Sequence, residues 1–308
     1  MTIRMEGIIP PLVTPFAKDG SINENMFRRI INNVIDAGVH GVFVAGSQGE
    51  FFSLERQERI RLFEVAVEEV NGRLPVYAGT AAVTTSETVL LTKAAEKSGC
   101  DAVSIISPFF ITPNGQELYK YYKTVAEITN LPILLYNNPN RTGYDIPIDT
   151  IKKLAEIDNI VGMKDSSGNL TYVNEVIRTT GPDFHFFCGR DTVIFNVLTS
   201  GGSGAVPASA NVAPKLIVDL YNYVKSGNYE AARQAQFDLA PLRMAFSLGS
   251  FPVVIKEALS ILGFDTGGAR APIQSLTPQN HRRLAEVLKK MKLIKSSEST
   301  KQSKSRYY

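Results

Sequence analysis

The chain has 308 residues, of which 44% are hydrophobic and 20% charged, and its formal net charge is +3. This composition is ordinary for a globular protein and excludes the collagen-like and disordered classes. No run of about 18 apolar residues predicts a membrane span, no signal-peptide pattern opens the sequence, and no basic surface interleaved with aromatic residues indicates nucleic-acid binding. We therefore expect a cytoplasmic protein that acts on small molecules, with neither a membrane nor a nucleic acid as partner.

Short apolar runs alternate with segments of helical periodicity along most of the chain, which indicates βα units and a parallel sheet. Eight runs are predicted to be strands, at residues 7–15, 41–46, 74–79, 101–107, 131–137, 160–164, 184–189 and 204–208. Start signals predict three of the helices: Asn23 or Glu24 begins the first, Ser53 caps the second, and Ser86 with Glu87 begins the third. Eight such units over roughly 220 residues suit a (β/α)8 barrel, or TIM barrel.

A doubly wound sheet is the competing α/β fold. It requires a glycine-rich phosphate turn after the first strand, and "VTPFAKDGS" supplies none. From about residue 226 onward the pattern contains helices alone. We therefore predict a TIM-barrel catalytic domain at residues 1–225, a small C-terminal helical extension at 226–295, and a flexible tail at 296–308.

The residues that commonly bind metals are scattered. The three histidines are isolated along the chain, and the two cysteines, Cys100 and Cys188, lie in apolar runs without metal-ligand spacing. We interpret the cysteines as small core residues and expect neither a metal site nor a disulfide.

Unusual residues gather at the predicted strand ends, where the loops of a parallel barrel converge on one cavity. Lys164 ends the sixth strand, Tyr136 lies near the end of the fifth, and Ser47 follows the second. An apolar barrel mouth disfavours the charged form of a lysine, and an uncharged amine can attack a carbonyl to form a Schiff base. A neighbouring phenol can shuttle the protons that this reaction needs.

Each of these residues also has a structural explanation. Lys164 could extend to the rim or pair with Asp165, and Tyr136 could be an ordinary core tyrosine. The turn "GSQGE" offers Ser47 and successive backbone N–H groups to a carboxylate, but glycine turns follow many strands. Arg141 could bind a second carboxylate with its planar fork or simply hold its own loop.

In combination these motifs resemble one family. "GSQGE", then "YNNPNRTG", then "GMKDSSGN" 28 residues after the tyrosine are similar to the pyruvate-dependent class I lyases that include dihydrodipicolinate synthase, N-acetylneuraminate lyase and 2-keto-3-deoxy-sugar-acid aldolases. The likeness extends over about residues 5 to 292 and includes "PLVTPF" and "GGSGAVPASAN". It implies a TIM barrel without an external cofactor, assembled as a homo-oligomer, either a tetramer or a dimer.

The resemblance also implies roles for particular residues. Lys164 would form an imine with pyruvate, Tyr136 and Ser47 would relay protons, and the amides of Ser47 and Gln48 would hold the pyruvate carboxylate. Substrate-binding roles are implied at Gln48, Gly49, Arg141, Gly189, Asp191 and Val206. The partners would be pyruvate and an aldehyde, joined or released at the pyruvate methyl carbon.

Two positions depart from the synthase pattern within this family. Gln48 stands where the synthases carry threonine, and Phe110 stands where they carry a second tyrosine that reaches over from the neighbouring subunit. Phenylalanine has no hydroxyl with which to pass a proton. Arg141 nevertheless resembles the synthase arginine that binds the carboxylate of aspartate semialdehyde, which favours an acidic aldehyde.

Other features favour the alternatives. "GEFFSL" and "CGRD", with Gly189 and Asp191 placed to meet hydroxyl groups, are similar to the sugar-acid aldolases. We therefore predict a dihydrodipicolinate synthase-like lyase of the lysine biosynthesis type, with a 2-keto-3-deoxy-sugar-acid aldolase as the alternative. A non-catalytic keto-acid-binding or regulatory descendant is the alternative from another class.

Overall fold

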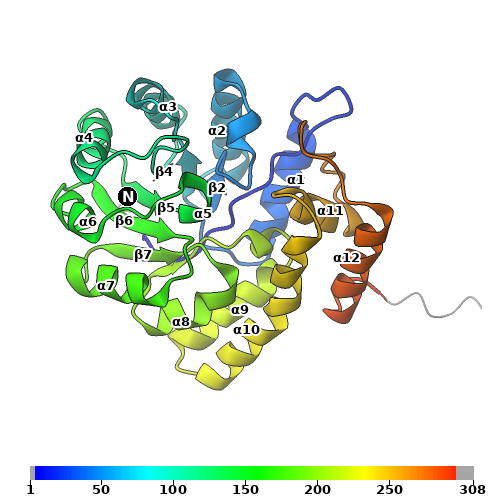
Figure 1. Cartoon of the computed structure of the whole chain (residues 1–308). Coiled ribbons are helices and arrows are strands. Elements are labelled where there is room, and N and C mark those ends of the chain that lie inside the picture. The colour runs from blue at the N-terminus through cyan, green and yellow to red at the C-terminus, as the bar shows by residue number, and fades with distance from the viewer. Residues whose placement is uncertain (1–3, 296–308) are drawn as a thin grey trace, which may run out of the picture.

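The computed structural model describes residues 4–295 and contains eight parallel strands in one curled sheet (Figure 1). The sheet order is β1-β8-β7-β6-β5-β4-β3-β2, and a parallel bridge between Pro11 and Phe43 joins its two edges. The strands are β1 Gly7–Ile8, β2 Val42–Val44, β3 Val76–Gly79, β4 Ala102–Ile106, β5 Ile133–Asn137, β6 Ile160–Asp165, β7 His185–Cys188 and β8 Gly204–Ala205. The predicted TIM barrel is confirmed.

All eight predicted strands are present, but the first is much shorter than the predicted 7–15. The reason is local chemistry: Pro10 and Pro11 have no N–H to donate to a ladder. Single hydrogen bonds replace the ladder, from Leu12 N to Phe43 O at 2.8 Å and from Phe43 N to Pro10 O at 2.9 Å. They keep the start of the chain against β2.

Helices surround the strands, as Figure 1 shows for α3, α4, α6, α7 and α8. Those of the barrel are α1 Glu24–Asp36, α2 Arg56–Val70, α3 Thr85–Lys97, α4 Gly115–Ala126, α5 Pro139–Thr142, α6 Ile148–Leu154, α7 Leu170–Thr180, α8 Ile194–Thr199 and α9 Pro214–Lys225. Asn23 caps α1 as predicted, because its side chain accepts a hydrogen bond from Met26 N at 3.1 Å.

Two predicted helix starts are wrong. Glu55, not Ser53, caps α2, because Glu55 and Glu58 form a reciprocal capping box. The Ser53 hydroxyl instead donates to Glu50 O within a short 3-10 turn. Thr84, not Ser86, caps α3, and its hydroxyl accepts from Glu87 N.

Two apolar layers form the core. A small cluster inside the barrel combines side chains from opposite parts of the sheet, and a larger cluster fills the space between the strands and the helices. The inner cluster consists of Met5, Ile9, Phe43, Tyr77, Ala102, Leu134, Phe187 and Val206. This packing fills the interior of the barrel, and a cavity opens beyond it among the carboxyl ends of the strands and the loops that follow them.

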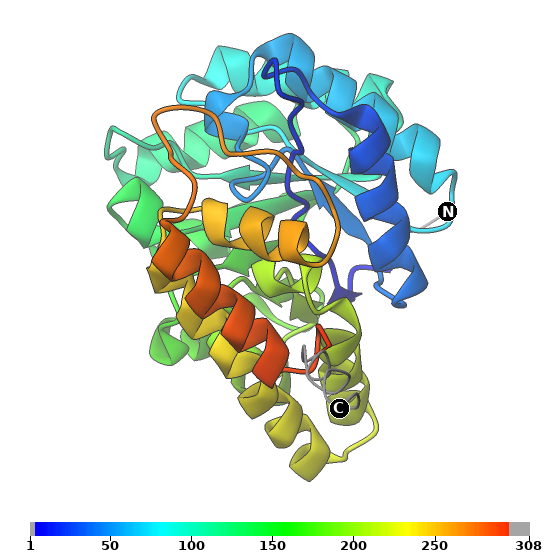
Figure 2. The same ribbon diagram turned by 90° about the vertical axis from the view of Figure 1, so that its right-hand side faces the viewer.

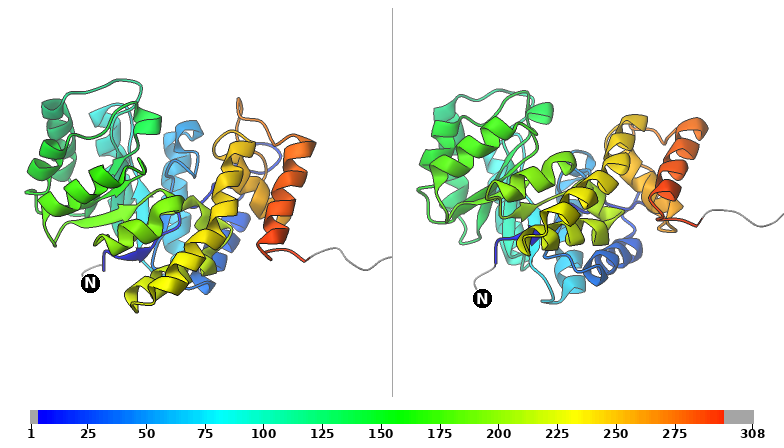
Figure 3. Two further views of the ribbon diagram at one scale, coloured as in Figure 1. Left: turned by 60° about the horizontal axis from the view of Figure 1, so that its bottom comes forward. Right: turned by 90° about the horizontal axis from the view of Figure 1, so that it is seen from below.

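The C-terminal helices α10 Tyr229–Met244, α11 Val253–Ile261 and α12 Pro278–Lys290 lie together at one side of the barrel (Figures 2 and 3). They lie within the stretch after residue 226 for which helices alone are predicted, while the predicted tail at 296–308 lies outside the described residues. No single helix within residues 4–295 is long and apolar enough to cross a membrane, and one bent pair, 229–248 with 253–261, passes that test by length and composition only.

Candidate active site

The side chains of Lys164 and Tyr136 lie next to each other at the carboxyl ends of β6 and β5. The two residues are register partners in the parallel ladder, so their side chains leave the sheet on the same face. Lys164 Nζ lies 4.0 Å from the centre of the Tyr136 ring and 5.3 Å from that of Phe43. Both Lys164 and Tyr136 are 4% exposed. The barrel therefore places a buried amine in an aromatic environment beside a phenol.

The neighbouring carboxylate, Asp165, does not pair with Lys164. Its Oδ1 accepts a hydrogen bond from Asn137 Nδ2 at 2.7 Å, and its Oδ2 accepts one from the Ser167 hydroxyl at 2.7 Å. Within residues 4–295, no carboxylate oxygen lies within 4.0 Å of Lys164 Nζ, whereas the other deeply buried lysine, Lys256, has such a partner. Strand alternation explains this, because consecutive residues point to opposite faces.

Gly189, after β7, allows Lys164 to lie where it does. A Cβ atom at this position would lie 2.9 Å from Lys164 Cε and 2.2 Å from the Ser166 hydroxyl oxygen. Any larger residue would therefore push against the lysine side chain.

The Tyr136 phenol oxygen accepts a hydrogen bond from Asn138 Nδ2 at 2.8 Å. Burial raises the pKa of Tyr136, but the positive charge of Lys164 and the hydrogen-bonding groups of Ser166, Asn138 and Ser47 lower it by more. The pKa of Tyr136 therefore lies below its usual value of about 10. A phenol with a lowered pKa gives up its proton more readily than a free tyrosine, which suits a group that passes protons.

The turn that follows β2 brings Ser47, Gln48 and Gly49 to the cavity. Ala45 and Glu50, on either side of it, have positive φ angles of 49° and 59°. Among the backbone hydrogen bonds of residues 4–295, none has the N–H of Ser47 or Gln48 as its donor. Successive N–H groups in a turn of this kind form a concave site for an anion.

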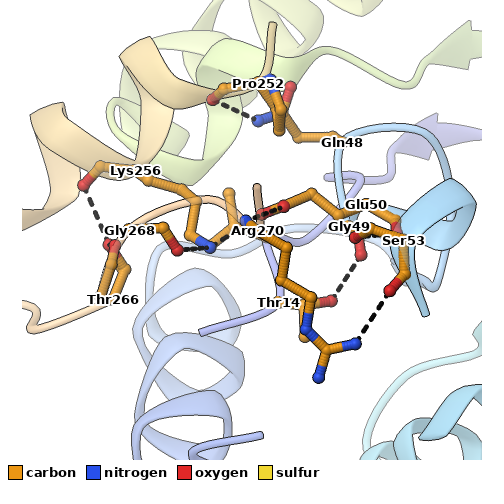
Figure 4. Close-up of polar contacts among 12 residues, drawn as sticks. Thr14, Gln48, Gly49, Glu50, Ser53, Pro252, Lys256, Thr266, Gly268 and Arg270 are labelled. Atoms are coloured by element: carbon orange, nitrogen blue, oxygen red, sulfur yellow. Dashed lines mark hydrogen bonds and ion pairs between the residues drawn. The ribbon is translucent and has the colours of Figure 1, made fainter. Parts of the chain in front are cut away.

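Contacts from two sides hold this turn in place, as Figure 4 shows. Thr14 Oγ1 donates to Gly49 O at 2.6 Å, and Gln48 Nε2 donates to Pro252 O at 3.4 Å. Gly49 is packed closely, since a Cβ there would lie 3.0 Å from Leu12 O. The first contact comes from the N-terminal segment and the second from the C-terminal extension.

Behind the turn, Glu50 forms a buried ion pair with Lys256 of α11 (Figure 4). Lys256 Nζ lies 2.7 Å from Glu50 Oε1 and also donates to Gly268 O at 2.7 Å. The second carboxylate oxygen of Glu50 accepts from Arg270 N at 3.0 Å. Glu50 is 0% and Lys256 1% exposed, so the pair is fully enclosed. The C-terminal extension therefore supports the turn after β2 from behind.

A cavity of about 120 Å³ opens above Lys164. Eight of the nine residues predicted for the site line this cavity, and the ninth, Gly49, belongs to the turn beside it. The predicted residues lining it are Ser47, Gln48, Tyr136, Arg141, Lys164, Gly189, Asp191 and Val206. The structure thus brings together residues from the ends of β5, β6 and β7 and from the segments after β2 and β8.

The predicted outer residues differ in their surroundings. The Arg141 side chain is exposed at the rim, with its guanidinium 4.5 Å from the centre of the Phe251 ring. Asp191 is buried, and its Oδ2 accepts hydrogen bonds from the Ser209 backbone N–H at 2.9 Å and from the Ser209 hydroxyl. Asp191 is therefore partly engaged in fixing the loop after β8.

Other lining residues were not predicted from the sequence. They include Asn138, Ser166, Arg190, Arg243, Phe246 and Phe251. Asn138 and Ser166 each lie two residues beyond a predicted functional residue, so their position at the strand ends was a usable signal. Arg243, Phe246 and Phe251 come from the C-terminal extension, and no local pattern in the sequence connects them to the barrel mouth.

Phe110 lies in the loop between β4 and α4, does not line the cavity, and is 96% exposed with a φ of 74°. Its neighbour Ile111 is 50% exposed. Cys100 and Cys188 are buried, as predicted for small core residues. Within residues 4–295 no group of three or more His, Cys, Asp or Glu side chains is arranged to hold a metal ion.

A parallel (β/α)8 barrel with chemically active side chains at the carboxyl ends of its strands defines the class: a TIM-barrel enzyme. Comparison with known proteins identifies the family. The family model described as the dihydrodipicolinate synthetase family matches residues 4–291. The chain belongs to this family, and it is a pyruvate-dependent lyase of the dihydrodipicolinate synthase-like type.

Relatives and solved structures agree with this assignment. The chain is 38% identical over 296 residues to the 4-hydroxy-tetrahydrodipicolinate synthase of Methanopyrus kandleri, covering 96% of this chain and 99% of the relative. It is 37% identical over 290 residues to that of Thermodesulfovibrio yellowstonii, covering 94% and 99%. A prophage protein of the same family from E. coli K12, solved in complex with pyruvate, superposes with a TM-score of 0.91 at 33% identity, covering 94% and 99%.

Proposed function

We propose that Lys164 forms the imine with pyruvate. The observation that carries this proposal is a buried amine that faces the cavity, packs on Tyr136 and has no carboxylate partner within the described chain. The amine would add to the keto carbon of pyruvate, and water would leave as the imine forms. The imine then accepts the electron pair released when the pyruvate methyl loses a proton, which gives an enamine.

The neighbouring groups suit the remaining steps. Tyr136, with its lowered pKa, and the Ser47 hydroxyl would move protons to and from the reacting atoms. The turn at Ser47, Gln48 and Gly49 would hold the pyruvate carboxylate through its backbone N–H groups. No external cofactor is needed for this chemistry, because the imine itself stores the electron pair.

The enamine would attack an acidic aldehyde such as aspartate semialdehyde, forming a carbon–carbon bond, and water would then release the product from the lysine. Arg141 at the rim would bind the aldehyde carboxylate. Gly189 leaves room beside the lysine, while Asp191 and Val206 would shape the acceptor side of the cavity.

Borohydride trapping tests the imine. Wild-type protein incubated with pyruvate and borohydride should gain the mass of one reduced pyruvate at Lys164, and the Lys164→Ala variant should gain none. Lys256 supplies an internal control within the wild-type protein, since it is also buried but is paired with Glu50 behind the turn. Lys256 should therefore remain unmodified. Wild-type protein that stays unmodified would refute the proposal and favour the non-catalytic binding role.

A sugar-acid aldolase is the second candidate. The amide and hydroxyl groups of Asn138, Asn140 and Ser166 line the cavity and could meet the hydroxyl groups of a longer substrate. Assays with aspartate semialdehyde and with 2-keto-3-deoxygluconate separate the two functions, with Arg141→Ala as the control. Unchanged use of the semialdehyde by that variant would show that Arg141 does not bind the acceptor carboxylate.

We further propose a homo-oligomer, a dimer or tetramer, in the cytoplasm. Phe110 and Ile111 support the assembly, because two adjacent exposed apolar side chains are costly to leave in water. Light scattering of the wild type and of Phe110→Glu tests it, since the charged variant should dissociate.

A further inference from the structure

A histidine side chain takes part in closing the barrel between β1 and β2. Ile8 N in β1 donates a hydrogen bond to Nδ1 of His40, which lies just before β2, at 3.1 Å, and His40 N donates to Ile8 O at 2.8 Å. An imidazole nitrogen therefore takes the place that a carbonyl oxygen occupies in an ordinary ladder. Because Nδ1 accepts this hydrogen bond, the neutral ring carries its proton on Nε2. The contact can exist only while His40 is neutral.

The His40 ring packs against both β1 and α9. A Cβ atom on Gly7 would lie 2.3 Å from His40 Cγ, so the ring rests directly on the Gly7 backbone. The φ of Gly7 is 92°, a conformation that favours glycine. The ring also meets that of Tyr221 in α9 edge to face, with the ring centres 4.9 Å apart. A second proton on the ring would point at the Ile8 N–H, and with the ring packed on these two elements, movement of β1 relieves that conflict.

The groups that face His40 come from the start of the chain and from α9. Burial lowers the pKa of His40, the Glu6 carboxylate raises it, and the positive charge of Arg4 lowers it. Glu6 pairs with Arg4 and lies 3.7 Å from Lys225 Nζ of α9. Burial raises the pKa of Tyr221, so this phenol stays neutral wherever His40 titrates. His40 is therefore neutral at neutral pH, and its protonation is opposed by the folded barrel.

The segment that follows β1 connects this histidine to the candidate active site. Residues 8–14 begin at the hydrogen bonds with His40 and end at Thr14, whose Oγ1 donates to Gly49 O at 2.6 Å. Between these points Leu12 N bonds to the end of the barrel seam at β2. A displacement of β1 would therefore be transmitted to the turn after β2, which we propose holds the pyruvate carboxylate.

We propose that His40 is an acid-sensitive latch on β1: protonation of Nδ1 breaks the hydrogen bond from Ile8 N, loosens β1 from β2 and, through residues 8–14, loosens the turn after β2. The latch goes beyond the proposed imine chemistry, because its opening requires no substrate. A released His40 binds its proton with the ordinary pKa of about 6.5, whereas the latched one has a lowered pKa. The latch is therefore fully closed above about pH 6.5 and weakens as pH falls below that value.

Hydrogen–deuterium exchange of the Ile8 amide, followed by mass spectrometry from about pH 7.5 to about pH 5, tests the latch. The protection factor, which corrects for the intrinsic exchange rate at each pH, should fall by up to about tenfold per pH unit below about pH 6.5. His40→Asn places an amide oxygen near the position of Nδ1 and cannot titrate, so its protection factor should stay level. His281→Asn, at a partly exposed position on α12, is the matched control and should behave as the wild type.

Two results would overturn the latch. One is a level protection factor in the wild-type protein. The other is an unchanged pH dependence in His40→Asn, which would point to His185, a histidine whose pKa Glu6 also affects. Glu6→Gln provides a test that leaves His40 in place: without the carboxylate that raises its pKa, the fall in protection should move to lower pH, and an unmoved fall would contradict the proposal.

Borohydride trapping of pyruvate at Lys164 tests the link to the turn, and this part rests on the proposed function. The trapping rate of the wild type divided by that of His40→Asn should fall below about pH 6.5, since the titration of the site itself is common to both proteins. A constant ratio would overturn the link. Absence of trapping in both proteins at every pH would overturn the imine, whereas the exchange measurement would still decide the latch.

Discussion

The buried pair of Glu50 and Lys256 predicts a large and specific effect on stability. Lys256→Met removes the cation and leaves the Glu50 carboxylate enclosed, with Arg270 N as its remaining hydrogen-bond donor. Breaking a buried ion pair by removing one partner costs about 3–5 kcal/mol. The variant also leaves Gly268 O without its donor, so we expect a loss within that range.

Urea unfolding followed by circular dichroism measures the loss. A companion variant carrying Glu50→Gln as well as Lys256→Met should lose less than Lys256→Met alone, because no uncompensated charge remains. Arg178→Gln, which breaks an exposed pair with Glu175, should produce no resolvable change. A loss below about 1 kcal/mol for Lys256→Met would refute the argument that the enclosed pair matters.

The same variants test whether the buried pair supports the turn after β2, which we propose binds the pyruvate carboxylate. If the pair holds Ser47 and Gln48 in place, Lys256→Met should raise KM for pyruvate more than it lowers kcat. The folded fraction, measured in parallel, corrects for simple unfolding. An unchanged KM in folded protein would show that the turn keeps its geometry without this support.

Four further predictions concern residues that line the cavity. Gly189→Ala should slow borohydride trapping and lower the free energy of unfolding by about 1–3 kcal/mol, because the new Cβ meets Lys164 Cε; unchanged trapping would contradict this. Lys164→Met should move the ionisation of Tyr136, followed by tyrosinate absorbance, to higher pH. The free energy of unfolding of the wild type, relative to that of Tyr136→Phe, should rise as pH increases from the lowered pKa of Tyr136 toward about 10, its value in the unfolded chain. Over that interval the unfolded chain holds the Tyr136 proton more fully than the folded protein does. Asp191→Ala should lower the free energy of unfolding by about 1–3 kcal/mol, because the two Ser209 donors lose their partner. Thermal unfolding measures this loss, and a smaller one would contradict the prediction.

Local sequence patterns predicted the strands and much of the site. Apolar runs marked all eight strands, and the rule that parallel strand ends converge brought Lys164, Tyr136 and Ser47 together. The roles of these residues remain proposals, as does a domain boundary at residue 225. Contacts across that boundary, such as Gln48 with Pro252, argue that the extension and the barrel form one working unit.

The missed features depend on tertiary packing or on competing local signals. Arg243 and Phe246 reach the cavity only because the C-terminal helices fold back over the barrel. The hydrophobic periodicity of a helix does not indicate which distant part of the chain that helix will contact. The cap of α2 was missed because Ser53 was a plausible cap, while the reciprocal Glu55 and Glu58 pattern was the stronger one. β1 is short because Pro10 and Pro11 cannot donate to the ladder, although they lie within an apolar run that is typical of a strand.

The cavity is assembled from two sources. Its floor comes from the strand ends of the barrel, and part of its outer wall comes from residues 243–251 of the C-terminal layer. Exchanging that stretch between relatives should change which aldehyde the cavity prefers and leave the surroundings of Lys164 unchanged. Such grafts would have to stop short of Pro252 and Lys256, because these two residues hold Gln48 and Glu50 in the turn after β2.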